Sequence, residues 1–194
     1  MQKTVIRASV AALLTLFSAA APSRAADTYS IDPMHTAIVF KISHIGLSST
    51  FGTFKQVSGK FTIDSDSPSH SKFELTIKTD SIDTFNAQRD AHLKTPDFFN
   101  TKQFPVMTFK STGVKAIDDG FEVTGDFTLH GTTKSVTFPL KGGKKAEFPA
   151  GIHRTGYTAE FTLKRSEFGV GSAKFADALG DDVAITVSFE GTRK

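Results

Sequence analysis

Apolar and polar residues alternate along most of the chain after residue 37, with an apolar side chain at every second position. This period of two predicts strands that have one buried and one solvent-facing side. The clearest segments are 38–43, 73–78, 121–129, 135–140, 157–164 and 183–190, and further strand candidates are 51–63 and 106–114. The pattern therefore predicts an all-β protein of about eight strands.

The connections between these segments are mostly short. Glycine-containing turns at 118–120 and 130–131 and a polar link at 65–69 separate consecutive strands, and short links favour antiparallel neighbours. Longer loops are expected at 141–155 and 165–181. With no second core, linker or repeat, we expect one antiparallel domain, either a sandwich or a closed barrel.

One polar stretch, residues 84–100, interrupts the strand pattern. Its first half, residues 86–93, suits a short helix with Thr84 or Asn86 as the N-cap. Pro96 ends this helix and begins a further single helical turn. That turn carries two aromatic residues, Phe98 and Phe99.

The first 25 residues differ from the rest of the chain. Basic residues at the start, an uncharged apolar run over 8–21 and small residues before Ala25 are typical of a secretory signal peptide. The run is shorter than the roughly 20 residues that a spanning helix needs. We expect cleavage after Ala25, export to the periplasm and a mature domain of residues 26–194. Cleavage after Ala21 and an uncleaved anchor are the alternatives.

Charge and cysteine content narrow the function classes. The net charge of +3 comes from Lys3, Arg7 and Arg24, and the remaining basic and acidic residues balance. The sequence therefore gives no reason to expect a nucleic-acid partner. It contains no Cys, which excludes disulfides, thiolate metal sites and thiol catalysis.

Phenylalanine dominates the aromatic residues, with 19 Phe against two Tyr and no Trp. Phe adds apolar area without a polar group, and burial of an aliphatic tail against such a surface is favourable. A Phe-lined interior would suit an isoprenoid or similar chain. The alternative is that these residues simply fill the core.

Several motifs in chain order resemble the YceI-like, polyisoprenoid-binding family. They are Tyr-Ser-Ile-Asp-Pro-Met-His-Thr at 29–36, Phe-Lys-Ile-Ser-His-Ile-Gly at 40–46, the run 85–111 around Phe-Asn-Ala-Gln-Arg-Asp-Ala-His-Leu, Gly-Asp-Phe-Thr-Leu-His-Gly at 125–131, and Leu-Lys-Arg-Ser-Glu-Phe-Gly-Val-Gly at 163–171. Lys164-Arg165 departs from the Asn-Arg that is frequent in the family.

The resemblance implies an extended, lipocalin-like antiparallel barrel with a short helical insertion near residues 86–100. It also implies a long hydrophobic tunnel that holds an isoprenoid or another long-chain amphiphile, such as a polyprenyl phosphate, a quinone-like lipid or a fatty amide. Binding for storage or transport is expected, without catalysis and without a cofactor. A homodimer is left open.

Two groups of residues are candidates for the ligand site. The predicted tunnel lining is Ile38, Phe40, Ile42, Phe73, Leu75, Phe109, Phe127 and Phe161, with Phe85, Phe98 and Phe99 covering one end. Candidates for a polar head group are Asn86, Arg89 and His92. Arg89 and His92 share one helix face through their i,i+3 spacing. The alternative is that these polar residues are structural, as a cap and an ion-pair anchor.

Other chemistry has little support in the sequence. The histidines lack the spacing of known zinc motifs, so no metal site is expected, and no Gly-x-Ser-x-Gly elbow is present. Two rivals to lipid binding are kept. One is a ligand-free structural or stress protein with a filled barrel, and the other is an enzyme that acts on a lipid or quinone.

Overall fold

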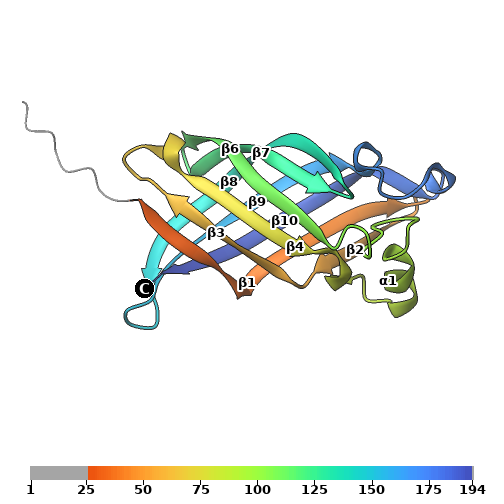
Figure 1. Cartoon of the computed structure of the whole chain (residues 1–194), viewed down its shortest axis with the longest axis horizontal. Helices are drawn as coiled ribbons and strands as arrows, with labels where there is room; N and C mark the ends of the chain where they lie inside the picture. The colour runs from red at the N-terminus through yellow and green to blue at the C-terminus, as the bar shows by residue number, and fades with distance from the viewer. Residues whose placement is uncertain (1–25, 194) are drawn as a thin grey trace, which may run out of the picture.

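The computed structural model describes residues 26–193, and the predicted signal peptide, residues 1–25, lies outside the described residues. The described chain forms long antiparallel strands with one short α-helix, α1 (Ala87–Leu93), at one end (Figure 1). The strands are β1 (Asp27–His44), β2 (Ser48–Phe54), β3 (Val57–Ile63), β4 (Lys72–Lys78), β5 (Ile82–Asp83), β6 (Val106–Ile117), β7 (Gly120–Leu129), β8 (Thr132–Glu147), β9 (His153–Lys164) and β10 (Leu179–Arg193).

The sheet closes into an eight-stranded barrel. The ladder runs β10-β9-β8-β7-β6-β4-β3-β1, and β1 pairs back onto β10. Closure pairs the backbone groups that an open edge would leave exposed. The choice between sandwich and barrel is thereby decided in favour of the barrel.

β2 and β3 together behave as one bent strand along β1. The first part of β1 pairs with β3 at Asp27–Ser30, and its last part pairs with β2 at Ile38–His44. The break falls at Lys55, whose N–H donates to the Ser81 carbonyl at 3.2 Å. The predicted single strand 51–63 is thus two strands, because at Lys55 the backbone hydrogen-bonds to the segment that leads into β5.

The prediction of a loop at 141–155 is wrong, because this segment is mostly strand. β8 continues to Glu147 and β9 begins at His153. The glycine pair Gly142-Gly143, which suggests a loop, lies at a register shift in the β8–β9 ladder and has positive φ angles of 130° and 93°. The backbone ladder therefore continues through a bulge that breaks the side-chain alternation.

Stacked aromatic rings fill the end of the barrel opposite α1. Tyr29 stacks on Phe61 with ring centroids 5.1 Å apart, and Phe61 stacks on Phe73 at 5.8 Å. Burial raises the pKa of Tyr157, which joins this cluster edge-on, to about 12. A Cβ at Gly191 would lie 2.3 Å from the Phe61 ring, so this close packing requires glycine there. The cluster is completed by Phe121 and Phe189.

Candidate ligand-binding site

A cavity of about 410 Å³ occupies the barrel interior between the aromatic cluster and α1. Its wall is almost wholly apolar. Ten residues predicted from the sequence to line a tunnel are on this wall: Ile38, Phe40, Ile42, Phe73, Leu75, Phe98, Phe99, Phe109, Phe127 and Phe161. Their contact with a ligand stays a prediction.

Strand geometry explains why alternate residues face the cavity. In β1 the lining residues are Ile38, Phe40 and Ile42, because successive side chains of a strand project to opposite faces. Their antiparallel partners in β10, Val187, Ile185 and Val183 respectively, also line the cavity. Paired apolar side chains therefore form successive layers around the space.

Aromatic side chains cover the α1 end of the cavity. Phe98 stacks on Phe175 at 4.8 Å, and the His92 ring packs edge-on against both of them. Phe99 packs edge-on against Phe54 from β2 at 5.5 Å. Phe175 belongs to the segment between β9 and β10, which lies at the same end of the barrel as α1 (Figure 1).

The prediction that Phe85 covers the tunnel is wrong. Its side chain is 82% exposed and does not line the cavity. The carboxylate of Asp83 accepts a hydrogen bond from the Phe85 N–H at 2.8 Å, and the Phe85 backbone has a φ of 62°. This turn directs the chain into α1 and leaves the ring outside.

Asn86 is also absent from the cavity wall. Its side-chain oxygen accepts a hydrogen bond from the Arg89 N–H at 2.9 Å, which makes Asn86 the N-cap of α1. This contact satisfies one of the free donors at the helix start. The predicted cap is therefore confirmed, and the contact supports the structural alternative over a head-group role.

Arg89 and His92 line the cavity from α1 and are partly exposed, so they lie at its mouth. Arg89 donates from Nε to the Thr84 hydroxyl at 2.7 Å and from Nη2 to the Thr84 carbonyl. The Thr84 hydroxyl in turn donates to the Asp90 carboxylate. Because Thr84 is buried, this series of hydrogen bonds anchors α1 to the barrel, which agrees with the structural alternative.

His92 takes part in a second polar group at the mouth. Its Nε2 lies 3.4 Å from the Asp97 carboxylate, which also accepts a hydrogen bond from Lys174 Nζ at 2.8 Å. The hydrogen bonds from Lys174 and then His92 lower the pKa of Asp97. These contacts tie the segment after α1 to the segment between β9 and β10.

Arg165 is a buried residue of the cavity wall that was not predicted from the sequence. Its guanidinium donates to four backbone carbonyls, those of Val170, Gly171, Leu179 and Gly180, at 2.9 to 3.3 Å. The planar fork of donors suits such multiple contacts. The sequence motif around Arg165 could have indicated a role for this residue, but a sequence does not reveal which backbone carbonyls a side chain contacts.

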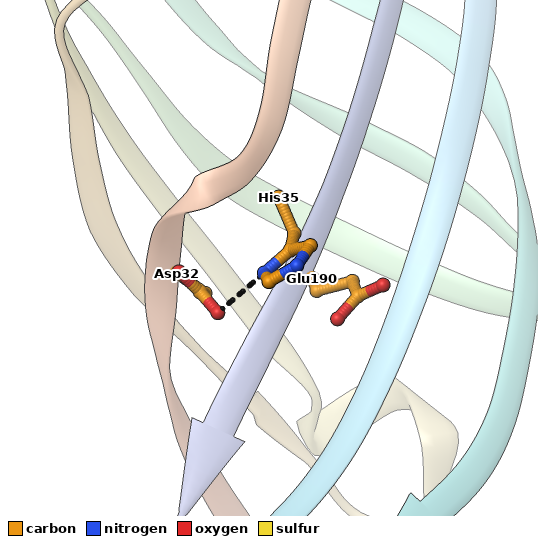
Figure 2. Close-up of side chains that lie close together, drawn as sticks. All are labelled: Asp32, His35 and Glu190. Atoms are coloured by element: carbon orange, nitrogen blue, oxygen red, sulfur yellow. Dashed lines mark hydrogen bonds and ion pairs between the residues drawn. The ribbon is translucent and has the colours of Figure 1, made fainter. Parts of the chain in front are cut away.

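Three side chains that could bind a metal, Asp32, His35 and Glu190, place one donor atom each within 4.8 Å of the others (Figure 2). They lie close to a register shift between Asp32 and Ala37 in the β1–β10 ladder. Asp32 accepts hydrogen bonds from His35 at 2.8 Å and from Arg154 at 2.7 Å, and Arg154 also lies 3.2 Å from Glu190. The guanidinium between the two carboxylates already supplies positive charge. We therefore interpret this group as an ion-pair network that joins β1, β9 and β10.

Comparison with known proteins gives consistent results. The model of the YceI-like domain matches residues 29–191. Protein YceI of Escherichia coli O17:K52:H18 (strain UMN026 / ExPEC) is 38% identical over 196 residues, covering all of both chains. BcnA of Burkholderia cenocepacia superposes with a TM-score of 0.75 at 22% identity, covering 82% of this chain and 98% of its own.

A polyisoprenoid-binding domain from Saccharophagus degradans, implicated in plant cell wall breakdown, superposes with a TM-score of 0.64. It is 16% identical, covering 86% of this chain and 98% of its own. At such identities, this likeness and that to BcnA concern the fold alone. Within residues 26–193, no helix has the length and apolar character needed to cross a membrane.

Proposed function

The chain belongs to the YceI-like family, and from this premise we propose that it holds one long-chain amphiphile inside the barrel for storage or transport. The ligand class is an isoprenoid or a similar lipid, such as a polyprenyl phosphate, a quinone-like lipid or a fatty amide. The observation that carries the proposal is the apolar cavity of about 410 Å³. The Saccharophagus degradans domain named as polyisoprenoid-binding supports it by analogy of fold.

The cavity volume lies within the range of sites that enclose a single small ligand. Its wall offers apolar contact from every barrel strand except β3, and burial of a hydrocarbon tail there contributes roughly 25 cal/mol per Å². A ligand with one tail therefore fits better than a two-tailed lipid. A hollow interior also favours binding over the rival of a barrel with a solid core.

The two ends of the cavity differ, which supports one orientation of the ligand. Phe73 and Phe189 form the floor in front of the stacked aromatic rings, whereas Arg89, His92 and His44 lie at the opposite end. A charged or hydroxylated head group is stabilised where it can reach polar groups and water. We infer that the tail enters first and that the head group stays near α1.

Binding without chemistry agrees with the state of the two arginines on the cavity wall. The donors of Arg165 are bonded to backbone carbonyls, and Arg89 is bonded to Thr84. A reaction on a lipid or quinone would need reactive groups that are free to engage the substrate. The predicted signal peptide extends the proposal to a carrier in the periplasm.

Native mass spectrometry before and after solvent extraction tests this function. We expect the purified protein to carry a lipid-like mass, and the emptied protein to take up a prenyl lipid or a fatty amide. Leu163→Trp would fill part of the cavity and should abolish retention. Thr162→Trp places the same residue at the neighbouring exposed position and should retain the ligand. A protein that is always empty and binds neither lipid class would refute the proposal.

A further inference from the structure

The tip of the β1–β2 hairpin has an unfavourable sequence for its backbone shape. The Leu47 N–H donates to the His44 carbonyl at 3.0 Å, and the central residues Ile45 and Gly46 have φ angles of 44° and 68°. Two left-handed central residues define a type I′ turn, which favours Asn-Gly. A β-branched residue such as Ile is poorly suited to this conformation.

Burial inside the protein does not compensate for this strain. The side chain of Ile45 is 51% exposed and that of Leu47 is 82% exposed. Phe85 has the same combination of a positive φ and an exposed side chain. Phe85 follows β5, and β5 pairs with β2. The strand β2 carries Phe51, whose side chain is half-exposed. We call Ile45, Leu47, Phe51 and Phe85 the apolar tip.

The charge on the hairpin itself is one-sided, although the exposed Glu160 lines the same surface hollow as Lys41 and Phe51, and the exposed Asp177 precedes Ala178. No Asp or Glu occurs in residues 33–63, a span that includes the whole hairpin. Lys41 is exposed and pairs in register with Phe51. On the adjoining strand β5, the carboxylate of Asp83 is ion-paired to Lys55 at 3.1 Å. Apolar side chains flanked by lysine suit a bilayer interface that contains anionic head groups.

The apolar tip is continuous with the mouth of the cavity. The Ile45 N–H donates to the Ala178 carbonyl at 2.8 Å, and both Ala178 and the adjacent His44 line the cavity. The hairpin end, α1 and the segment before β10 lie together at one end of the barrel (Figure 1). A surface that met the apolar tip would therefore meet the end where a lipid can enter.

We propose that the apolar tip docks on the surface of a lipid bilayer, with Ile45 and Leu47 inserted among the lipids and Lys41 at head-group level. Docking places the mouth of the cavity against the source or destination of the ligand. The proposal builds on the proposed function, but it is tested by vesicle binding, which requires no ligand in the cavity.

The absence of Trp from the chain allows a clean probe of insertion. We expect Leu47→Trp fluorescence to shift to the blue on vesicles of phosphatidylcholine and phosphatidylglycerol, and to be quenched by brominated lipid. Phe148→Trp, at a 74% exposed position in the β8–β9 loop at the other end of the barrel, should not respond. An unresponsive Leu47→Trp, or an equal response of both, would overturn the docking.

Ile45→Asn separates docking from folding. Asn suits the left-handed position, so the melting temperature should rise, whereas vesicle co-sedimentation should weaken about tenfold as one inserted apolar side chain is lost. Phosphatidylcholine alone should bind less than the anionic mixture, and salt should reduce that difference. Unchanged co-sedimentation of Ile45→Asn would contradict the proposal. So would self-association through the tip, seen by sedimentation without vesicles.

The two proposals can fail separately. Native mass spectrometry of Ile45→Asn should show ligand retained in the cavity, because Ile45 does not line it. Retained ligand without vesicle binding by the parent protein would refute docking alone. Vesicle binding by a protein that never accepts a lipid would refute the proposed function alone.

Discussion

Three arginines show how single residues position the larger segments of this protein. Arg89 anchors α1 through Thr84, Arg165 gathers four backbone carbonyls beside the cavity, and Arg154 joins Asp32 to Glu190. Arg154 and Arg165 each join two separate parts of the chain, whereas Arg89 makes two contacts with the single residue Thr84. Its rigid fork of donors makes such contacts more specific than a lysine could.

Asp32 should make stability depend on acid pH. The hydrogen bond from Arg154, followed by that from His35, lowers its pKa from 3.8 to about 2. As the pH falls below 3.8 the unfolded chain binds the proton first, so the stabilisation is complete above that pH and is lost towards about 2. Asp32→Asn should cost about 1 kcal/mol at neutral pH, after allowance for solvent screening.

Urea unfolding over a pH series measures this effect, and Asp32→Asn should show a shallower loss of stability in that acid window. Asp118→Asn, in the exposed β6–β7 turn, is the matched control and should behave as the parent protein does. A steep acid loss that persists in Asp32→Asn would show that other carboxyl groups are responsible.

Alternation predicted the inward residues well, because a strand fixes the direction of each side chain. Phe85 was wrongly predicted to cover the tunnel, and the head-group role predicted for Asn86 has no support in the structure. Both residues follow the two-residue strand β5, so the alternation of strand side chains gives no guide to their direction. Arg165 escaped prediction because its partners are carbonyls brought together by the fold.

At the scale of elements, α1 is a short cover that depends on its attachments. Seven residues form only two turns, which is too short for a stable isolated helix. Its N-cap Asn86, the hydrogen bond of Arg89 to the buried Thr84 and the edge-on packing of His92 against Phe98 hold it over the cavity. The position of α1 over the mouth therefore depends on these tertiary contacts.

Loss of the cap should loosen this cover. We expect Asn86→Ala to lower the free energy of unfolding by about 1 kcal/mol and to accelerate lipid release, because α1 would leave the mouth more often. Stopped-flow release of a fluorescent fatty-acid analogue measures the second effect. Gln88→Ala, at an exposed position of the same helix, should change neither quantity appreciably, and faster release from this control would undermine the interpretation.

The predicted ends of several elements were less accurate than their existence. β8 and β9 extend through the region expected to be a loop, and β1 begins at Asp27 rather than near residue 38. Both extensions rest on backbone hydrogen bonds across bulges, which side-chain patterns do not reveal. Barrel closure likewise depends on a pairing of the first and last strands, which local patterns cannot indicate.

At the scale of the whole molecule, the barrel has a solid half and a hollow half. The rings of Tyr29, Phe61 and Tyr157 fill the end away from α1, and the cavity occupies the rest. The phenylalanine excess therefore serves both of the purposes considered from the sequence. Some rings fill the core, and others form an apolar wall around open space.

Ligand removal should affect these halves unequally. We expect amide hydrogen exchange in the extracted protein to accelerate at the α1 end, in β2 and in the segment between β9 and β10, because these parts lose packing. Exchange around Tyr29 and Phe61 should stay as slow as in the loaded protein, since neither side chain lines the cavity. Uniform acceleration over the whole barrel would contradict this division.

The pairing of β1 with β10 carries a consequence for assembly. Ser30 lies opposite Thr192, and Ile42 lies opposite Val183, so the first strand finds its second neighbour only when the end of the chain has emerged. Contacts this distant in sequence make folding slow relative to local structure. Without that pairing, β1 and β10 would both be open sheet edges. Pairing of β10 with β1 closes the sheet around the cavity. A chain that ended within β10 would therefore lose the enclosed cavity itself.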